Sequence, residues 1–98
     1  MKTKKITINN TDISEILDLI SQNNTVNLVL DLKNTSFTEK DLEKIFQFAE
    51  EVNTNGTTFV VVKENVDFDT LSEEWNIVPT LQEADDLISL DEMMRDLE

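Results

Sequence analysis

Apolar residues gather in short runs that have the composition of buried strands. Residues 4–8 place Ile6 and Ile8 on one face and Thr7 on the other, residues 26–32 are apolar on both faces, and residues 58–62 form an unbroken β-branched and aromatic run. Apolar cover on both faces is typical of a central strand in a parallel sheet. A fourth, brief edge strand is predicted over residues 75–78, where Pro79 ends it.

Between these strands the apolar residues recur at intervals of three and four, which predicts amphipathic helices. Each helix has a polar residue at the N-cap position and an acidic residue three positions later, as in a capping box. The pairs are Asp12 with Glu15, Thr38 with Asp41, and Thr80 with Glu83. The three apolar stripes comprise Ile13, Ile16, Leu17 and Ile20, then Leu42, Ile45, Phe46, Ala49 and Val52, then Leu81, Ala84, Leu87 and Ile88.

Two further features complete the predicted chain. Gly56 is the single glycine, and it follows the second helix, where a left-handed backbone is expected to end that helix. The acidic residues 67–74 are predicted to form one or two helical turns. The order of elements predicts one α/β domain over residues 1–98, with a mostly parallel four-stranded sheet and helices packed on it. The 32 Leu, Ile, Val and Phe residues suffice for a core.

The end of the last predicted helix, which spans about 80–97, carries a second apolar group. Leu90, Met94 and Leu97 extend the helix's stripe, and Met93 lies beside them. Two alternatives remain open. These residues complete the core, or the helix outruns this small domain and exposes an adaptable apolar surface among carboxylates.

Charge is distributed unevenly along the chain. The formal net charge is −13, and residues 64–98 contribute −11 of it, with Arg95 as their one basic side chain. Such a surface repels nucleic acid and anionic membranes, so neither is expected as a partner. It attracts a basic protein surface. The alternative is that the charge only keeps the domain soluble.

Composition also limits the location and the chemistry. The chain has no cysteine and no histidine, so disulfides, thiol nucleophiles, conventional triads and zinc sites are not expected. It has no apolar run of membrane-span length, and its lysine-containing N-terminus lacks a signal-peptide core. A cytoplasmic, non-enzymatic protein without cofactor is therefore expected, as a monomer or weak homodimer.

Carboxylates are the remaining candidates for chemistry. Asp67, Asp69, Glu73 and Glu74 alternate like calcium ligands but lack the glycine and spacing of a calcium loop, which favours helix capping and solvation over metal binding. The carboxylates at 85–86, 91–92 and 96 are interpreted as a solvated helix face. Two aromatic residues also stand out. Trp75 is expected to anchor the core or an edge, whereas Phe48, off its helix stripe, packs under a neighbour or makes an exposed contact.

The segment from Val26 to Leu42 resembles a known family. A strand ends in Asp31-Leu32, a few residues lead to Phe37, and a helix opens toward Leu42. This layout, with the order of elements up to about Ile88, resembles the STAS or anti-anti-sigma family, which implies a small STAS-like domain and a protein partner. The family's Asp-Ser-Ser-Gly phosphorylation motif is missing.

Asp41 falls nearest to the family's phosphorylated serine. The resemblance therefore implies an interaction domain that has lost its phosphoswitch. A carboxylate at a helix N-terminus could imitate the phosphate, or it could serve only in the capping box. Phosphorylation at a shifted hydroxyl, on Thr35, Ser36 or Thr38, is the alternative to a lost switch.

A narrower resemblance covers residues 76–88 and 92–97. These are similar to short bacterial proteins often labelled ribonuclease Z, a label that does not transfer because this chain lacks the nuclease's metal-binding histidines. The leading hypothesis is a regulatory or adaptor module, and a carboxylate-based metal-binding domain is the third alternative. The candidate partner-binding residues are Thr38, Glu39, Asp41, Leu90, Met93, Met94 and Leu97.

Overall fold

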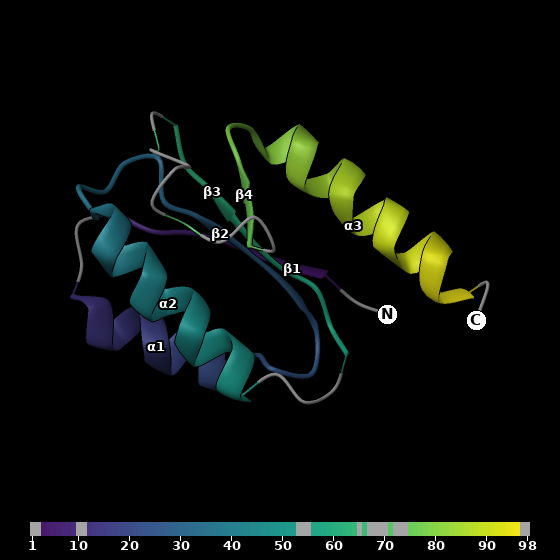
Figure 1. Cartoon of the computed structure of the whole chain (residues 1–98), viewed down its shortest axis with the longest axis horizontal. Helices are drawn as coiled ribbons and strands as arrows, with labels where there is room; N and C mark the ends of the chain where they lie inside the picture. Colours follow the sequence, from purple (N-terminus) through teal and green to yellow (C-terminus); the bar gives the residue numbers. More distant parts are fainter. Residues whose placement is uncertain are drawn as a thin grey trace.

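The computed structural model describes residues 3–9, 12–52, 56–64, 66, 71 and 75–96, and it shows a three-layer α/β domain (Figure 1). The elements follow in the order β1 (Thr3–Thr7), α1 (Ile13–Gln22), β2 (Asn27–Asp31), α2 (Glu39–Val52), β3 (Phe59–Val62), β4 (Asn76–Val78) and α3 (Leu81–Asp96). Helices α1 and α2 lie together on one side of the sheet, and α3 lies on the other.

The four strands form one sheet in the order β1-β2-β3-β4, and every neighbouring pair is parallel. The predicted α/β fold with a four-stranded parallel sheet is confirmed, and no antiparallel pair occurs among the described strands. Right-handed crossovers between consecutive neighbours place their connections on one face of the sheet. This accounts for α1 and α2 sharing a face and leaves the opposite face for α3 (Figure 1).

Strand β2 is buried along its whole length because each of its faces packs in a different core. Leu28 and Leu30 face α1 and α2 together with Val61 of β3. Val29 faces α3 together with Val60 and Val62. The two-sided apolar pattern read from the sequence therefore corresponds to a sheet covered on both sides. The larger core, toward α1 and α2, is built around Ile16, Ile20, Leu42, Ile45, Phe46 and Ala49.

The predicted helix starts are confirmed in position, but only two of them use a side-chain cap. The backbone N–H of Thr38 donates to Oδ2 of Asp41 at 3.0 Å, and the N–H of Asp41 donates back to Oγ1 of Thr38 at 3.4 Å. The N–H of Glu83 donates to Oγ1 of Thr80 at 3.2 Å. Asp12 has the extended backbone of an N-cap without a side-chain cap bond.

The predicted positions of Gly56 and Trp75 are confirmed, and Phe48 takes one of its two predicted positions. Gly56 has a φ of 73°, as expected for a left-handed residue. Trp75 stacks on Phe46 with ring centroids 5.2 Å apart and donates from Nε1 to Oε1 of Glu50 at 2.7 Å, so it anchors the core. Phe48 packs against the same core half-buried. Apart from Leu71, the helical turns predicted over residues 67–74 lie outside the described residues.

None of the helices that the structure describes combines the length and the apolar character needed to cross a bilayer.

Candidate functional site

The first half of α3 attaches to the sheet through apolar contacts. Ala84 and Ile88 are buried against the face formed by β2 and β3, and Leu81 and Leu87 pack beside them half-buried. These four residues are the stripe predicted from the sequence. Ile88 is the last buried apolar residue among the described residues of α3.

In the second half of α3, carboxylates replace apolar residues on the side that faces the sheet. Oε1 of Glu92 accepts a hydrogen bond from Nδ2 of Asn27 at 2.8 Å, and Oδ2 of Asp91 accepts one from Oγ1 of Thr58 at 3.1 Å. Both carboxylates are half-buried. The interpretation of residues 91–92 as a solvated face is therefore wrong.

Asn27 connects three elements at the start of β2. Its side chain is fully buried, with Oδ1 accepting the backbone N–H of Thr58 at 2.9 Å while Nδ2 donates to Glu92. A buried amide needs such partners because a buried polar group without one costs about 1–3 kcal/mol. Asn27 was not among the predicted site residues, because the apolar residues alone define the pattern of its strand.

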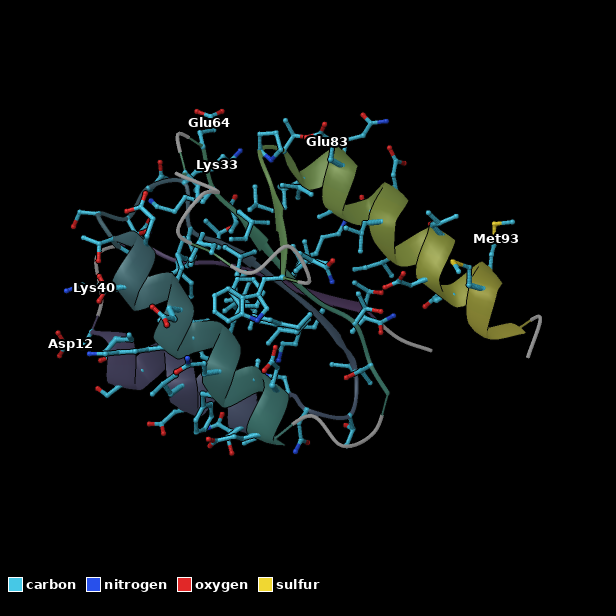
Figure 2. All side chains as sticks on the ribbon, in the orientation of Figure 1. Asp12, Lys33, Lys40, Glu64, Glu83 and Met93 are labelled. Atoms are coloured by element: carbon cyan, nitrogen blue, oxygen red, sulfur yellow. The ribbon has the colours of Figure 1, made fainter. Side chains whose placement is uncertain are left out.

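The apolar residues near the end of α3 are exposed rather than buried against the sheet. Leu90, Met93 and Met94 are 58%, 63% and 60% exposed, and they are the only exposed large hydrophobic residues among those described. Met93 projects from the end of the helix, clear of the remaining layers (Figure 2). We call Leu90, Met93 and Met94 the α3 patch.

The position of the α3 patch decides between the two alternatives left open by the sequence. The extension of the buried stripe through Leu90 and Met94 is wrong, and the exposed surface is correct for Leu90, Met93 and Met94. The helical period explains this position. Residues three and four positions after Ile88 share its face of the helix, and these are Asp91 and Glu92 rather than Leu90. Leu97 lies outside the described residues.

Acidic side chains lie on the same helix as the α3 patch. Glu83 and Asp86 are exposed. Asp85 pairs with Lys5 of β1, with Nζ 2.6 Å from Oδ1 and 2.7 Å from Oδ2, and both side chains are about half exposed (46% and 48%). At this exposure the ion pair adds little stability. The outer surface of α3 is thus apolar at one end and acidic along its length.

The second predicted contact surface lies elsewhere on the domain. Thr38, Glu39 and Asp41 begin α2, after the carboxyl end of β2, whereas the α3 patch lies on the opposite face of the sheet, where the strands begin (Figure 1). Asp41 acts in the capping box, with the N–H and hydroxyl of Thr38 as its partners. The structure therefore separates the two groups of candidate residues.

The other hydroxyls considered for phosphorylation lie in the loop before α2. Thr35 is half-buried and donates from Oγ1 to the carbonyl of Leu32 at 2.7 Å, and Ser36 is exposed. Nζ of Lys63 donates to the carbonyl of Thr35 at 2.9 Å, which joins this loop to the end of β3.

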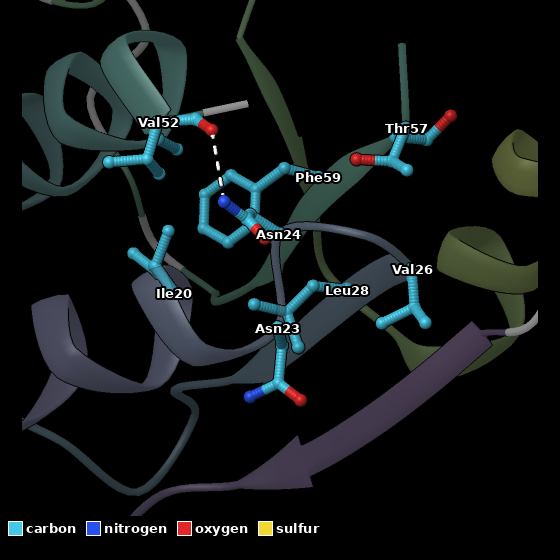
Figure 3. A pocket seen from close by; sticks show the side chains of 10 residues that line it. Ile20, Asn23, Asn24, Val26, Leu28, Val52, Thr57 and Phe59 are labelled. Carbon is cyan, nitrogen blue, oxygen red and sulfur yellow. Dashed lines mark hydrogen bonds between the residues drawn. The ribbon is translucent and has the colours of Figure 1, made fainter. Parts of the chain in front are cut away.

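Two hollows that are lined by described residues lie near the amino ends of the strands. One, of about 10 Å³, lies between α1, α2 and the start of β3 and is lined by Ile20, Ala49, Val52 and Phe59 among others (Figure 3). Asn24 borders it and donates from Nδ2 to the carbonyl of Val52 at 3.3 Å. This volume holds about one water molecule and no organic ligand.

The second hollow is open and measures about 320 Å³. It lies between the end of α3 and the starts of β3 and β4. Its lining includes Met94 of the α3 patch and Asp91, and on the sheet side Gly56, Thr57, Thr58, Phe59 and Asn76. We call it the strand-start hollow.

Within the described part of the chain, no group of three or more acidic side chains is placed to hold a metal ion. The calcium-like carboxylates Asp67, Asp69, Glu73 and Glu74 lie outside that part. The arrangement at the end of α3 can therefore offer apolar contact, charge and hydrogen-bond acceptors to a partner.

Comparison with protein-family models, curated proteins and solved structures finds no match to this chain. The resemblances to the STAS family and to the short bacterial proteins remain predictions from the sequence.

Proposed function

We propose that this protein is a non-enzymatic interaction module of a regulatory or adaptor kind, acting in the cytoplasm, and that the α3 patch binds a basic amphipathic helix of a partner protein. The observation that carries the proposal is the exposure of Leu90, Met93 and Met94 on one end of one helix. A small domain gains nothing in stability from exposing three large apolar side chains together, and such groups are typical of binding surfaces.

The spacing of the patch suits a helical partner. Residues 90, 93 and 94 are related as i, i+3 and i+4, which forms a ridge that packs between the side chains of a second helix. Methionine adapts to partner surfaces of different shape because its side chain is unbranched and polarisable. The proposed contact is therefore helix against helix.

The acidic residues of α3 favour a partner with basic side chains. Helix α3 carries six acidic residues and one basic residue, which favours lysine and arginine on the incoming helix. The same charge opposes binding of a second copy of this chain through α3, because two acidic helices would be brought together. The partner is thus expected to be a different protein, and the STAS resemblance adds the expectation that the partner is regulated by binding.

The test uses a defined probe. A fluorescein-labelled 18-residue peptide, with leucines on one helical face and lysines on the other, is titrated with the protein and followed by anisotropy. We expect binding by the wild type and at least tenfold weaker binding by the triple variant Leu90→Gln, Met93→Gln, Met94→Gln. This variant keeps every charge, so the loss would report apolar contact alone.

Two controls make the result specific. Gln82→Ala changes an exposed residue of α3 away from the patch and should leave the affinity unchanged. A peptide with glutamate in place of lysine should not bind. Equal binding of the lysine peptide by the wild type and the triple variant, with both folded by circular dichroism, would overturn the proposal and attribute any binding to net charge.

A further inference from the structure

Two of the three residues of the α3 patch are methionines. The chain has three methionines, Met1, Met93 and Met94, so both of those that follow the first residue belong to the patch. Their side chains are mostly exposed, and Met93 projects from the helix (Figure 2). The apolar surface that carries the proposed function is therefore built largely from thioethers, and a thioether, unlike leucine, can be oxidised.

Hydrogen peroxide oxidises a thioether by transferring one oxygen atom to the sulfur. The O–O bond breaks and an S–O bond forms, the sulfur loses two electrons, and the second oxygen of the peroxide leaves as water. The product, methionine sulfoxide, is polar where the thioether was apolar. On an exposed side chain this change buries no polar group, so the surface changes its character while the fold is kept.

The rest of the chain offers little competition for peroxide. The chain has no cysteine, whose thiolate is the usual target in proteins. The one tryptophan, Trp75, is half-buried, with its ring stacked on Phe46 and its Nε1 donating to Glu50. Hydrogen peroxide is uncharged, so the six acidic residues of α3 do not repel it as they would repel an anionic oxidant.

We propose that Met93 and Met94 are an oxidation site, at which hydrogen peroxide switches the α3 patch from an apolar to a polar surface. In the oxidised patch only Leu90 keeps its apolar character. The effect on a partner rests on the proposed docking function: oxidation releases the partner helix, whereas the change at the patch itself can be tested alone.

The exposure of both sulfur-containing side chains also makes the switch reversible. Methionine sulfoxide reductases, one for each epimer of the sulfoxide, need access to the side chain. Two electrons from a pair of thiols restore the thioether, the thiols become a disulfide, and the oxygen leaves as water. Binding and oxidation oppose each other, because a docked helix covers the patch that the oxidant must reach.

The first measurement locates the oxidation. The full chain is treated with hydrogen peroxide together with N-acetyl-methionine amide, and sulfoxide at Met93 and Met94 is followed by peptide mass spectrometry. We expect both residues to react within about fivefold of the rate of the free compound, because both are mostly exposed. Slower reaction than this at both residues would overturn the oxidation site.

The second measurement follows the patch without any partner. Retention on a phenyl-substituted column reports exposed apolar surface, so the oxidised wild type should elute earlier, with an unchanged urea midpoint. The control is the double variant Met93→Leu, Met94→Leu, which keeps the patch apolar and retains Met1. Its retention should not change after the same treatment. Unchanged retention of the fully oxidised wild type, or an equal change in both proteins, would overturn the switch.

The third measurement connects the switch to docking. The oxidised wild type should bind the lysine peptide at least about tenfold more weakly than the untreated protein, and treatment with both reductases should restore the affinity. The double leucine variant should bind the peptide equally before and after peroxide. Peptide binding that the triple glutamine variant loses but the fully oxidised wild type keeps would overturn the switch and retain the docking function.

The opposite outcome is distinguishable. If the triple glutamine variant bound the peptide as the wild type does, the docking function would fail. A change in column retention that peroxide causes in the wild type, and that the double leucine variant lacks, would still support the oxidation site in that case.

Discussion

Asn27 and Glu92, 65 residues apart in the chain, are joined by a 2.8 Å hydrogen bond from Nδ2 to Oε1. This bond joins the first residue of β2 to the second half of α3, beyond Ile88, the last buried apolar residue described in that helix. The second half of α3 is thus positioned by polar contacts. A helix held in this way can present an apolar outer face without being drawn into the core.

Replacing Asn27 should destabilise the domain although the substitution adds apolar character. In Asn27→Leu the backbone N–H of Thr58 and the carboxylate of Glu92 lose their partner, and we expect a decrease of about 2–3 kcal/mol in the free energy of unfolding. Urea unfolding followed by Trp75 fluorescence measures it. The control is Asn34→Leu at an exposed position, expected to change stability by less than about 0.5 kcal/mol. Equal effects of the two substitutions would mean that the Asn27 bonds contribute nothing.

Two leucines in the same chain should respond oppositely to truncation. Leu30 is fully buried between β2 and the α1–α2 layer, so Leu30→Ala should cost about 2–5 kcal/mol of unfolding free energy. Leu90 is mostly exposed, so Leu90→Ala should change stability by less than about 0.5 kcal/mol. Thermal and urea unfolding of both variants provides the measurement. A large loss of stability in Leu90→Ala would place that residue in the core and remove it from the binding surface.

The N-cap residues of α1 and α2 should contribute differently to the free energy of unfolding. Thr38→Ala removes a side-chain cap and is expected to cost about 1 kcal/mol, whereas Thr38→Ser retains the hydroxyl and should cost much less. Asp12→Ala removes no side-chain cap bond, so only its favourable charge at the start of α1 is lost, about 0.3–0.5 kcal/mol. Denaturant midpoints at constant m-value rank the three variants. An Asp12→Ala loss as large as that of Thr38→Ala would contradict the ranking.

A side chain at Gly56 should fit in the available space, but the backbone conformation at this position should disfavour it. A Cβ at this position would meet no atom within 4 Å, so steric clash is not the obstacle. The φ of 73° is the obstacle, and Gly56→Ala should destabilise the domain by about 1–2 kcal/mol, with Gly56→Asn less affected because asparagine visits this region more readily. The same unfolding assay compares them. Equal stability of the alanine variant and the wild type would show that the backbone relaxes to a different conformation.

Much of the fold could be predicted because the decisive signals are local. The β-branched runs gave the parallel strands, and the capping pairs Thr38–Asp41 and Thr80–Glu83 gave two helix starts that the structure reproduces. The position of Asp12 was also correct, yet its side chain makes no cap bond, since the identity of a residue does not determine its rotamer. The face covered by α3 was not predicted, because periodicity within a helix does not specify its partner.

The candidate site was predicted in part, and its open alternative and its one error have the same origin. For Leu90 and Met94 the sequence left a buried and an exposed position open, and Asp91 and Glu92 were read as solvated, because the sequence does not show what the end of α3 lies against. Where α3 passes the strand starts, the sheet itself becomes polar through Asn27 and Thr58, and matching polar groups on the helix replace apolar ones. The helical period counted from Ala84 and Ile88 already indicated that Asp91 and Glu92 face the sheet. Their pairing with Thr58 and Asn27 could be seen only in the three-dimensional structure.

The edge position of β1 has a consequence for the protein at high concentration. An edge strand presents unpaired backbone groups along which another chain could add, and lysines along such a strand discourage this addition. β1 is an edge strand, and its exposed residues include Lys4 and Lys5. The strand therefore combines a sheet edge suited to aggregation with charges that oppose it, and neutralising these two lysines would weaken the domain's own protection against fibre-like assembly.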